Sequence, residues 1–141
     1  MDHWLFLRQV ARGLHCDERR AEGVTFAVFQ ALRDRLTPKE AADVAAQLPT
    51  KLKRFWQEGD RPNRHVEKTH KEEFLGRVRR SAALPDTAEA ERAVTAVFSA
   101  LQMLLGSPTG REGEAWDVFS QLPRDLKMLW LAAGEQNAKV S

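Results

Sequence analysis

The sequence contains no isoleucine and no tyrosine, and among its 141 residues only ten are valine and seven are threonine. Because strands favour β-branched and aromatic side chains, this scarcity argues against a β-sheet protein. Alanine and arginine instead supply nineteen and fifteen residues, and both favour helices. We therefore predict an all-α fold.

Cysteine and long apolar runs are also scarce. Cys16 is the single cysteine, so no internal disulfide can form, and we expect a reducing compartment. No window reaches about 18 apolar residues, and the first residues lack the basic start of a signal peptide, so we expect a cytoplasmic protein without a transmembrane segment. A formal net charge of +2 is not the balance of a dedicated nucleic-acid binder.

The sequence repeats itself. The segment 27–32 (AVFQAL) recurs sixty-nine residues later as 96–101 (AVFSAL), and the segment 47–56 recurs seventy-four residues later as 121–130. Near the front, Phe6 and Leu7 match Phe74 and Leu75 at an offset of sixty-eight. We predict a single domain, 1–141, made of repeat one (1–57), a linker (58–69) and repeat two (70–141). A shared core is favoured because a unit of about sixty residues is hard to stabilise alone.

Each repeat is predicted to contain four helices, which gives a helical bundle of about eight helices sharing one core. In repeat one we expect helices at 2–13 and 18–36, the second capped by Asp17. Thr37, Pro38 and Glu40 have the spacing of a capping box that opens a short third helix ending at Gln47. The apolar second helix is the expected hub of its repeat, with a narrow polar strip at Gln30 and Arg33. Ser99 and Gln102 lie on the same strip in repeat two.

These segments resemble a known family. The residues that carry the resemblance are the turn Leu36-Thr37-Pro38-Lys39-Glu40-Ala41-Ala42, the segment Ala46-Gln47-Leu48-Pro49, and the restart Lys71-Glu72-Glu73-Phe74-Leu75 with the closing segment 121–130. Together they are similar to the bacterial family catalogued as domain of unknown function 2267, over nearly the whole chain. The resemblance implies a small, soluble, all-helical bacterial protein. It supplies no activity and no catalytic residues.

Few residue patterns point to chemistry. The four histidines and Cys16 lack the spacing of metal ligands, and no residue can orient a base toward the thiol, so we predict no catalytic residue, no metal and no cofactor. Acidic pairs such as Glu72 and Glu73 stand in first turns, where capping explains them. The loop 106–113 has glycines and hydroxyls before a helix, but it lacks a P-loop ending, and we interpret it as a plain connection.

The segment from residue 51 to 71 is the most basic part of the chain, with seven basic residues against three acidic ones. Its basic residues are Lys51, Lys53, Arg54, Arg61, Arg64, Lys68 and Lys71. Repeat two has Asp125 in place of Lys51 and Met128 in place of Arg54, so the shared fold does not require this charge. One interpretation is a solvated helix end followed by a charged linker. The other is a patch for an anion or a partner.

We consider three hypotheses for the function, each from a different functional class. The first hypothesis is a non-enzymatic helical interaction module, with a protein partner or a second copy bound by its surface. The alternative is binding of nucleic acid or another polyanion through residues 51–71. The third is an enzyme with a site at the repeat interface, for which no nucleophile, base and orienting group can be assembled from the sequence.

Overall fold

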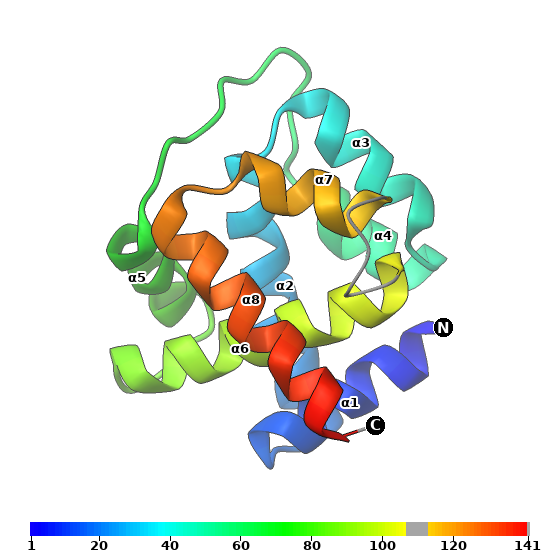
Figure 1. The fold of residues 1–141 in the computed structure, drawn as a ribbon, viewed down its shortest axis with the longest axis vertical. Helices are drawn as coiled ribbons and strands as arrows, with labels where there is room; N and C mark the ends of the chain where they lie inside the picture. The colour runs from blue at the N-terminus through cyan, green and yellow to red at the C-terminus, as the bar shows by residue number, and fades with distance from the viewer. Residues whose placement is uncertain (107–112, 141) are drawn as a thin grey trace.

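The computed structural model describes residues 1–106 and 113–140, with side chains up to residue 137. Within these ranges the chain forms eight helices and no strand (Figure 1). The helices are α1 (His3–Leu14), α2 (Glu18–Arg35), α3 (Pro38–Gln47), α4 (Thr50–Gln57), α5 (Lys71–Ser81), α6 (Thr87–Leu105), α7 (Glu114–Gln121) and α8 (Arg124–Val140). The predicted all-α bundle is confirmed. Of the loop 106–113, only Gly106 and Gly113 lie within the described residues.

Short polar side chains start the helices. Asp2, Asp17 and Asp86 each accept a hydrogen bond from the backbone N–H three residues later, at 2.8 to 2.9 Å. Such caps satisfy amides that have no partner inside the helix. The cap predicted at Asp17 is therefore confirmed, and α2 begins at the next residue.

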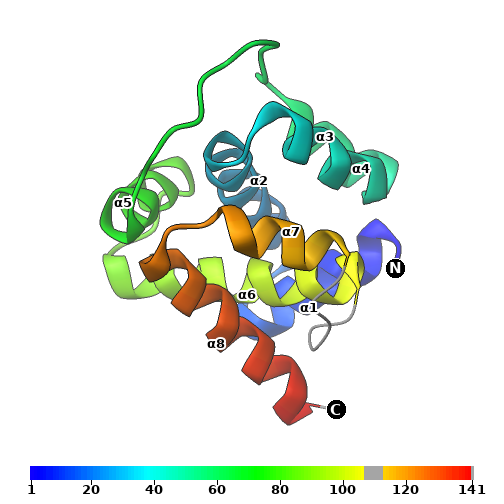
Figure 2. The same cartoon turned by 45° about the horizontal axis from the view of Figure 1, so that its top comes forward.

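The long helices α2 and α6 lie at the centre, and the other helices surround them (Figure 2). The two central helices contact each other, α1 packs against both, and so does α5. Buried apolar side chains from both halves of the chain form one hydrophobic cluster. Each half therefore completes the core of the other. Among the described helices, none has the length and apolar character needed to span a bilayer.

The same set of rings fills the core in both halves. In the first half, Phe29 of α2 contacts Phe6 and Trp56, with ring centroids 5.7 and 5.4 Å apart. In the second half, Phe98 of α6 contacts Phe74 and Trp130 at 6.1 and 4.9 Å. Buried aromatic pairs in tilted or edge-to-face arrangements contribute about 0.5 to 1.5 kcal/mol beyond their buried area.

Candidate functional site

The two halves also meet at their third helices, because α3 packs against α7. Thr37, which caps the start of α3, bonds with Gln121 at the end of α7: its N–H donates to Gln121 Oε1 over 3.0 Å. Glu114, at the start of α7, lies beside Asp43 in the middle of α3. The two helices therefore run antiparallel. Both views show them side by side (Figures 1 and 2).

Carboxylates gather at this contact. One carboxylate oxygen from each of Glu40, Asp43 and Glu114 lies within 4.8 Å of the others. We call these three residues the carboxylate cluster. Glu40 is only 6% exposed. Its Oε2 is buried without a hydrogen-bond partner, and the same is true of Glu114 Oε2. Unpartnered buried carboxylate oxygens are costly, so this arrangement needs a proton or a cation.

The surroundings of Glu40 disfavour its negative charge. Burial has the largest effect, followed by the approach of the Glu114 carboxyl, with which Glu40 can form a hydrogen bond only when one of the two holds a proton, and by the charges of Glu114, Asp117 and Asp43. Together they raise the pKa of Glu40 to about 8. Among the described residues, the basic side chain paired with this group is Lys39, whose Nζ lies 3.4 Å from Asp43 Oδ2. Lys39 is itself exposed.

The predicted capping box at the start of α3 is half formed. Thr37 Oγ1 accepts a hydrogen bond from the Glu40 N–H over 3.2 Å, and Pro38 occupies the first helical position, as predicted. The return bond from Thr37 N–H to the Glu40 side chain is replaced by the bond to Gln121. This frees the Glu40 carboxyl to turn toward Glu114.

Sequence reasoning missed this cluster because it assigned Glu40 to helix capping. The signal was present: Glu40 and Glu114 are seventy-four residues apart, and so are Asp43 and Asp117. That offset is the one that relates the segments 47–56 and 121–130. Equivalent residues of repeat one and repeat two can contact each other only near a rotation axis that relates the two repeats. The sequence does not specify where that axis lies.

The residues of the basic segment have different surroundings in the structure. Arg64 is largely buried and donates to the backbone carbonyls of Arg33 and Leu36 at the end of α2, over 2.8 and 2.9 Å. Its Nε lies 2.8 Å from Asp60 Oδ1. A guanidinium placed there stabilises the carboxyl end of a helix dipole. Arg64 therefore has a structural role at this end of α2.

Two further basic residues pair within the fold. Lys51 Nζ lies 2.5 Å from Glu22 Oε1, and Lys71 Nζ lies 3.1 Å from Glu91 Oε1. Lys53 is half-buried, whereas Arg54, Arg61 and Lys68 are exposed.

Aromatic side chains are exposed on one face of the first half. Trp4 of α1 is 54% exposed, and Lys51 Nζ lies 5.8 Å from its ring centroid. Phe26 of α2 is also exposed and contacts the half-buried ring of Phe55, with centroids 5.9 Å apart. Since Lys51 and Phe55 are one turn apart on α4, these groups form a continuous patch. We call Trp4, Glu22, Phe26, Lys51 and Phe55 the Trp4 surface.

The second half exposes apolar side chains at other places. Met103, Trp116, Met128 and Leu131 are exposed, whereas Leu105 is buried and Leu104 is half-buried. The apolar end of α6, residues 103–105, is thus only partly at the surface.

The side chains considered for catalysis have different environments. Burial raises the pKa of the Cys16 thiol, which disfavours the reactive thiolate. His15 is the left-handed cap of α1, and His70 precedes α5 with its Nδ1 3.6 Å from Asp125 Oδ2. His3 stacks beside Trp4 with ring centroids 5.0 Å apart. Each of these contacts joins one of the histidines to a different part of the fold.

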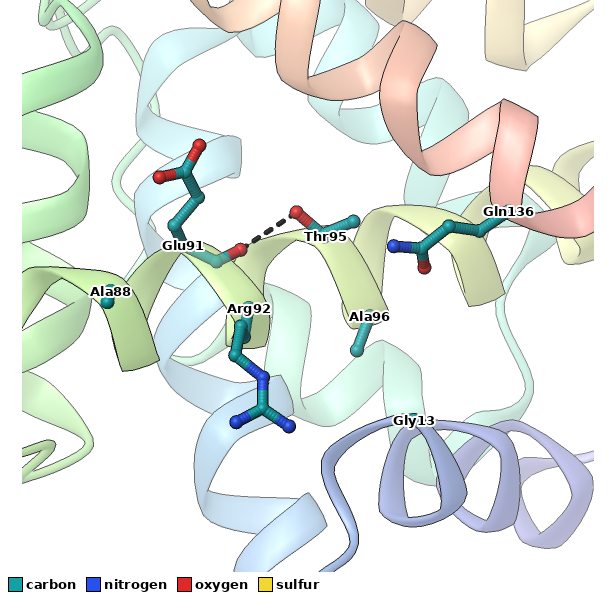
Figure 3. Close-up of a pocket in the computed structure, with 7 residues that line it drawn as sticks. All are labelled: Gly13, Ala88, Glu91, Arg92, Thr95, Ala96 and Gln136. Carbon is teal, nitrogen blue, oxygen red and sulfur yellow. Dashed lines mark hydrogen bonds between the residues drawn. The ribbon is translucent and has the colours of Figure 1, made fainter.

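A pocket lies between the end of α1, the first half of α6 and α8 (Figure 3). Its polar side chains include Glu91, Arg92, Thr95 and Gln136. Thr95 Oγ1 donates to the Glu91 carbonyl over 2.8 Å, the Glu91 carboxylate pairs with Lys71, and Arg92 pairs with Glu89. Most of the polar groups in this pocket are therefore already partnered.

Comparison with protein families identifies a related family. A family model described as "Uncharacterized conserved protein (DUF2267)" matches residues 3–129. No curated protein matches the chain. The matched range includes α1 to α7 and the first part of α8.

Proposed function

The chain belongs to the DUF2267 family of uncharacterized conserved proteins, and from this premise we propose that it is a non-catalytic interaction module. The proposed binding site is the Trp4 surface, and the proposed ligand is a protein partner. The observation that carries the proposal is the exposure of Trp4 and Phe26 on a scaffold that does not need them.

The second half supports this interpretation. At the positions that correspond to Trp4 and Phe26, it has Glu72 and Thr95, at offsets of sixty-eight and sixty-nine. Both halves nevertheless form the same order of four helices. Aromatic residues that the fold can replace by Glu or Thr favour a binding role, because tryptophan and other aromatic residues are enriched at protein interfaces.

The contacts of the polar groups support a non-catalytic role. Arg33 and Arg64 bond to helix carbonyls, and Glu40 and Glu114 face each other between two packed helices. The described nucleophile and histidines belong to separate contacts. A reaction centre would need a nucleophile, a base and an orienting group within hydrogen-bond reach.

The test exchanges residues between the halves. The double variant Trp4→Glu/Phe26→Thr places the second half's residues on the Trp4 surface, so helix formation is preserved. Met128→Arg is the matched control, because it makes the reverse exchange at an exposed position of α8. Proteins captured from a lysate are compared for the three chains, and sedimentation velocity measures self-association.

We expect the double variant to lose a partner that the parent and Met128→Arg both retain. Equal capture and equal sedimentation for all three chains would contradict the proposal. Circular dichroism confirms that each variant keeps its helices.

Polyanion binding is the second candidate, and one observation favours it. Arg54, Arg61 and Lys68 are exposed, and no ion pair holds them within the described part of the chain. Binding to DNA or RNA would weaken steeply as salt rises, and Lys51→Glu or Arg54→Glu would weaken it further. Absence of binding at low salt would end this hypothesis.

A further inference from the structure

The carboxylate cluster has a geometry that a proton alone does not explain. A shared proton bridges two carboxyl groups, but the cluster brings together three, from two helices that belong to different halves. Asp117, one turn after Glu114 on α7, adds a fourth negative charge that acts on Glu40. Even with Lys39 paired to Asp43 and one proton shared, these four carboxyl groups keep a net negative charge.

The buried oxygen of Glu40 provides a second observation. This side chain is more than nine-tenths buried, and its Oε2 lacks a hydrogen-bond partner while the side chain faces the carboxyls of Asp43 and Glu114. Native proteins rarely leave a buried carboxylate oxygen without a partner. Such an atom is accounted for when it coordinates a cation.

We propose that Glu40, Asp43 and Glu114 bind a hard divalent cation that links α3 to α7. Ca²⁺ binds oxygen ligands at about 2.3 to 2.6 Å, so two oxygens on opposite sides of one ion are about 4.6 to 5.2 Å apart. The cluster's oxygens, all within 4.8 Å of one another, fit that separation. Because the three side chains offer only oxygen, the site suits Ca²⁺, Mg²⁺ or Mn²⁺ and not a cation that prefers sulfur or imidazole.

The cation joins the two halves of the chain. Glu40 and Asp43 come from the first half and Glu114 from the second, so bound metal connects helices that are otherwise joined here by packing and by the bonds between Thr37 and Gln121. The proposal does not depend on the Trp4 surface, which lies on α1, α2 and α4. Its failure and the failure of the interaction proposal are therefore separate results.

The test is titration calorimetry of the full-length chain with Ca²⁺, Mg²⁺ and Mn²⁺, each alone, at neutral pH and low salt. We expect one ion per chain for at least one of the three cations. Glu40→Gln removes one coordinating charge at nearly constant shape and should weaken binding by at least about tenfold. Glu72→Gln is the matched control, because it removes the same charge from an exposed first turn of α5 and should leave affinity unchanged.

Thermal unfolding provides a readout that does not depend on calorimetry. The cation that binds should raise Tm of the parent and of Glu72→Gln above the value in EDTA, because a ligand of the folded state stabilises it. Glu40→Gln should have a Tm in EDTA at least as high as the parent, which shows that it folds, and no rise with cation. Two results would overturn the proposal: no binding of any of the three cations at millimolar concentration, or equal binding by the parent and Glu40→Gln.

Discussion

The two halves attach their last helix to the hub helix by different chemistry. In the first half, Arg33 of α2 donates to the Trp56 carbonyl of α4 over 2.9 Å, and its charge is met by Asp34 at 2.9 Å and Asp60 at 3.7 Å. In the second half, Gln102 of α6 donates to the Trp130 carbonyl of α8 over 2.8 Å. Equivalent backbone carbonyls thus accept a hydrogen bond from equivalent positions of α2 and α6. The donor is a guanidinium cation in the first half and a neutral amide in the second.

The difference extends to the neighbouring residues. Asp34 and Asp60 correspond to Met103 and Gly134, at offsets of sixty-nine and seventy-four. A Cβ at Gly134 would lie 2.9 Å from Gln102 Oε1, so this glycine lets α8 approach the amide. The whole charged group has therefore been exchanged as a unit for a neutral one. The comparison shows that the fold requires a hydrogen-bond donor at this position of α2 and α6, and that the donor does not need to be charged.

The largest expected effect comes from removing the tryptophan that both halves share. Trp56→Ala and Trp130→Ala each remove an indole that packs on a hub phenylalanine, and each should lower the free energy of unfolding by about 3 to 5 kcal/mol. Because the core is continuous, both variants should unfold in a single transition in urea, followed by circular dichroism. Two separated transitions would mean that the halves fold independently. The two halves could then not be treated as parts of one core.

The second prediction concerns the hub donor. Arg33→Gln installs the residue of the second half but removes one of the cations paired with Asp34 and Asp60, and it should cost about 2 to 3 kcal/mol. The double variant Arg33→Gln/Asp34→Met reproduces the neutral pair and should recover about 1 kcal/mol, measured by urea unfolding as a double-mutant cycle. Recovery is partial because Asp34 also pairs with Arg77 at 2.8 Å. An Arg33→Gln chain as stable as the parent would show that the guanidinium contributes only volume.

The third prediction concerns pH at the contact between the halves. The pKa of Glu40 is raised from its ordinary value near 4.5 to about 8, so the unfolded chain loses this proton first as pH rises. The free energy of unfolding should therefore fall between about pH 4.5 and pH 8, by up to about 1.4 kcal/mol per pH unit. Glu40→Gln should remove this component when urea unfolding is measured in EDTA across that range. Glu72→Gln should keep it, and equal slopes in the two variants would contradict the assignment to Glu40.

The smallest effect is expected at the surface. Lys51→Asp installs the residue of the second half, breaks the ion pair with Glu22 and removes the cation from the Trp4 ring. Exposed pairs contribute little, so the loss should be below about 1 kcal/mol in thermal unfolding. Asp125→Lys is the reciprocal change in the second half. It also removes the acceptor of a hydrogen bond, because the Lys71 N–H donates to Asp125 Oδ2 over 2.9 Å. A loss of several kcal/mol on Lys51→Asp would show that this surface is part of the core.

Much of the fold was predictable because its signals are local. Asp17 and Thr37 cap helices whose starts they specify, and the repeated aromatic positions identify the buried face of each helix. The polar strip at Gln30 and Arg33 was predicted too. Gln30 Nε2 donates to the Phe55 carbonyl over 2.8 Å, and Arg33 reaches the next carbonyl. Local periodicity places such residues on a face without knowledge of what lies opposite.

The candidate site was not predictable because it depends on docking. Glu40 has the local pattern of a capping residue, and its meeting with Glu114 follows only from the way α3 packs on α7. Arg64 shows the same limit: composition places it in a charged linker, but the bend of that linker brings it onto the end of α2. Long-range packing determines whether a charge faces solvent or a helix end.

The connection between the halves has a consequence for proteolysis. Residues 58–70 carry no helix, yet Arg64 is bound to the end of α2, and the Glu67 N–H donates to the Asp34 carbonyl over 2.9 Å. Trypsin needs an extended, accessible backbone at its cleavage site and does not cut before proline. It should therefore cut after the exposed Lys68 well before the largely buried Arg64, and not after Arg61, which Pro62 follows. The nicked protein would consist of two polypeptides without a covalent link. Because the core is continuous across both, they should elute together at the size of the intact chain.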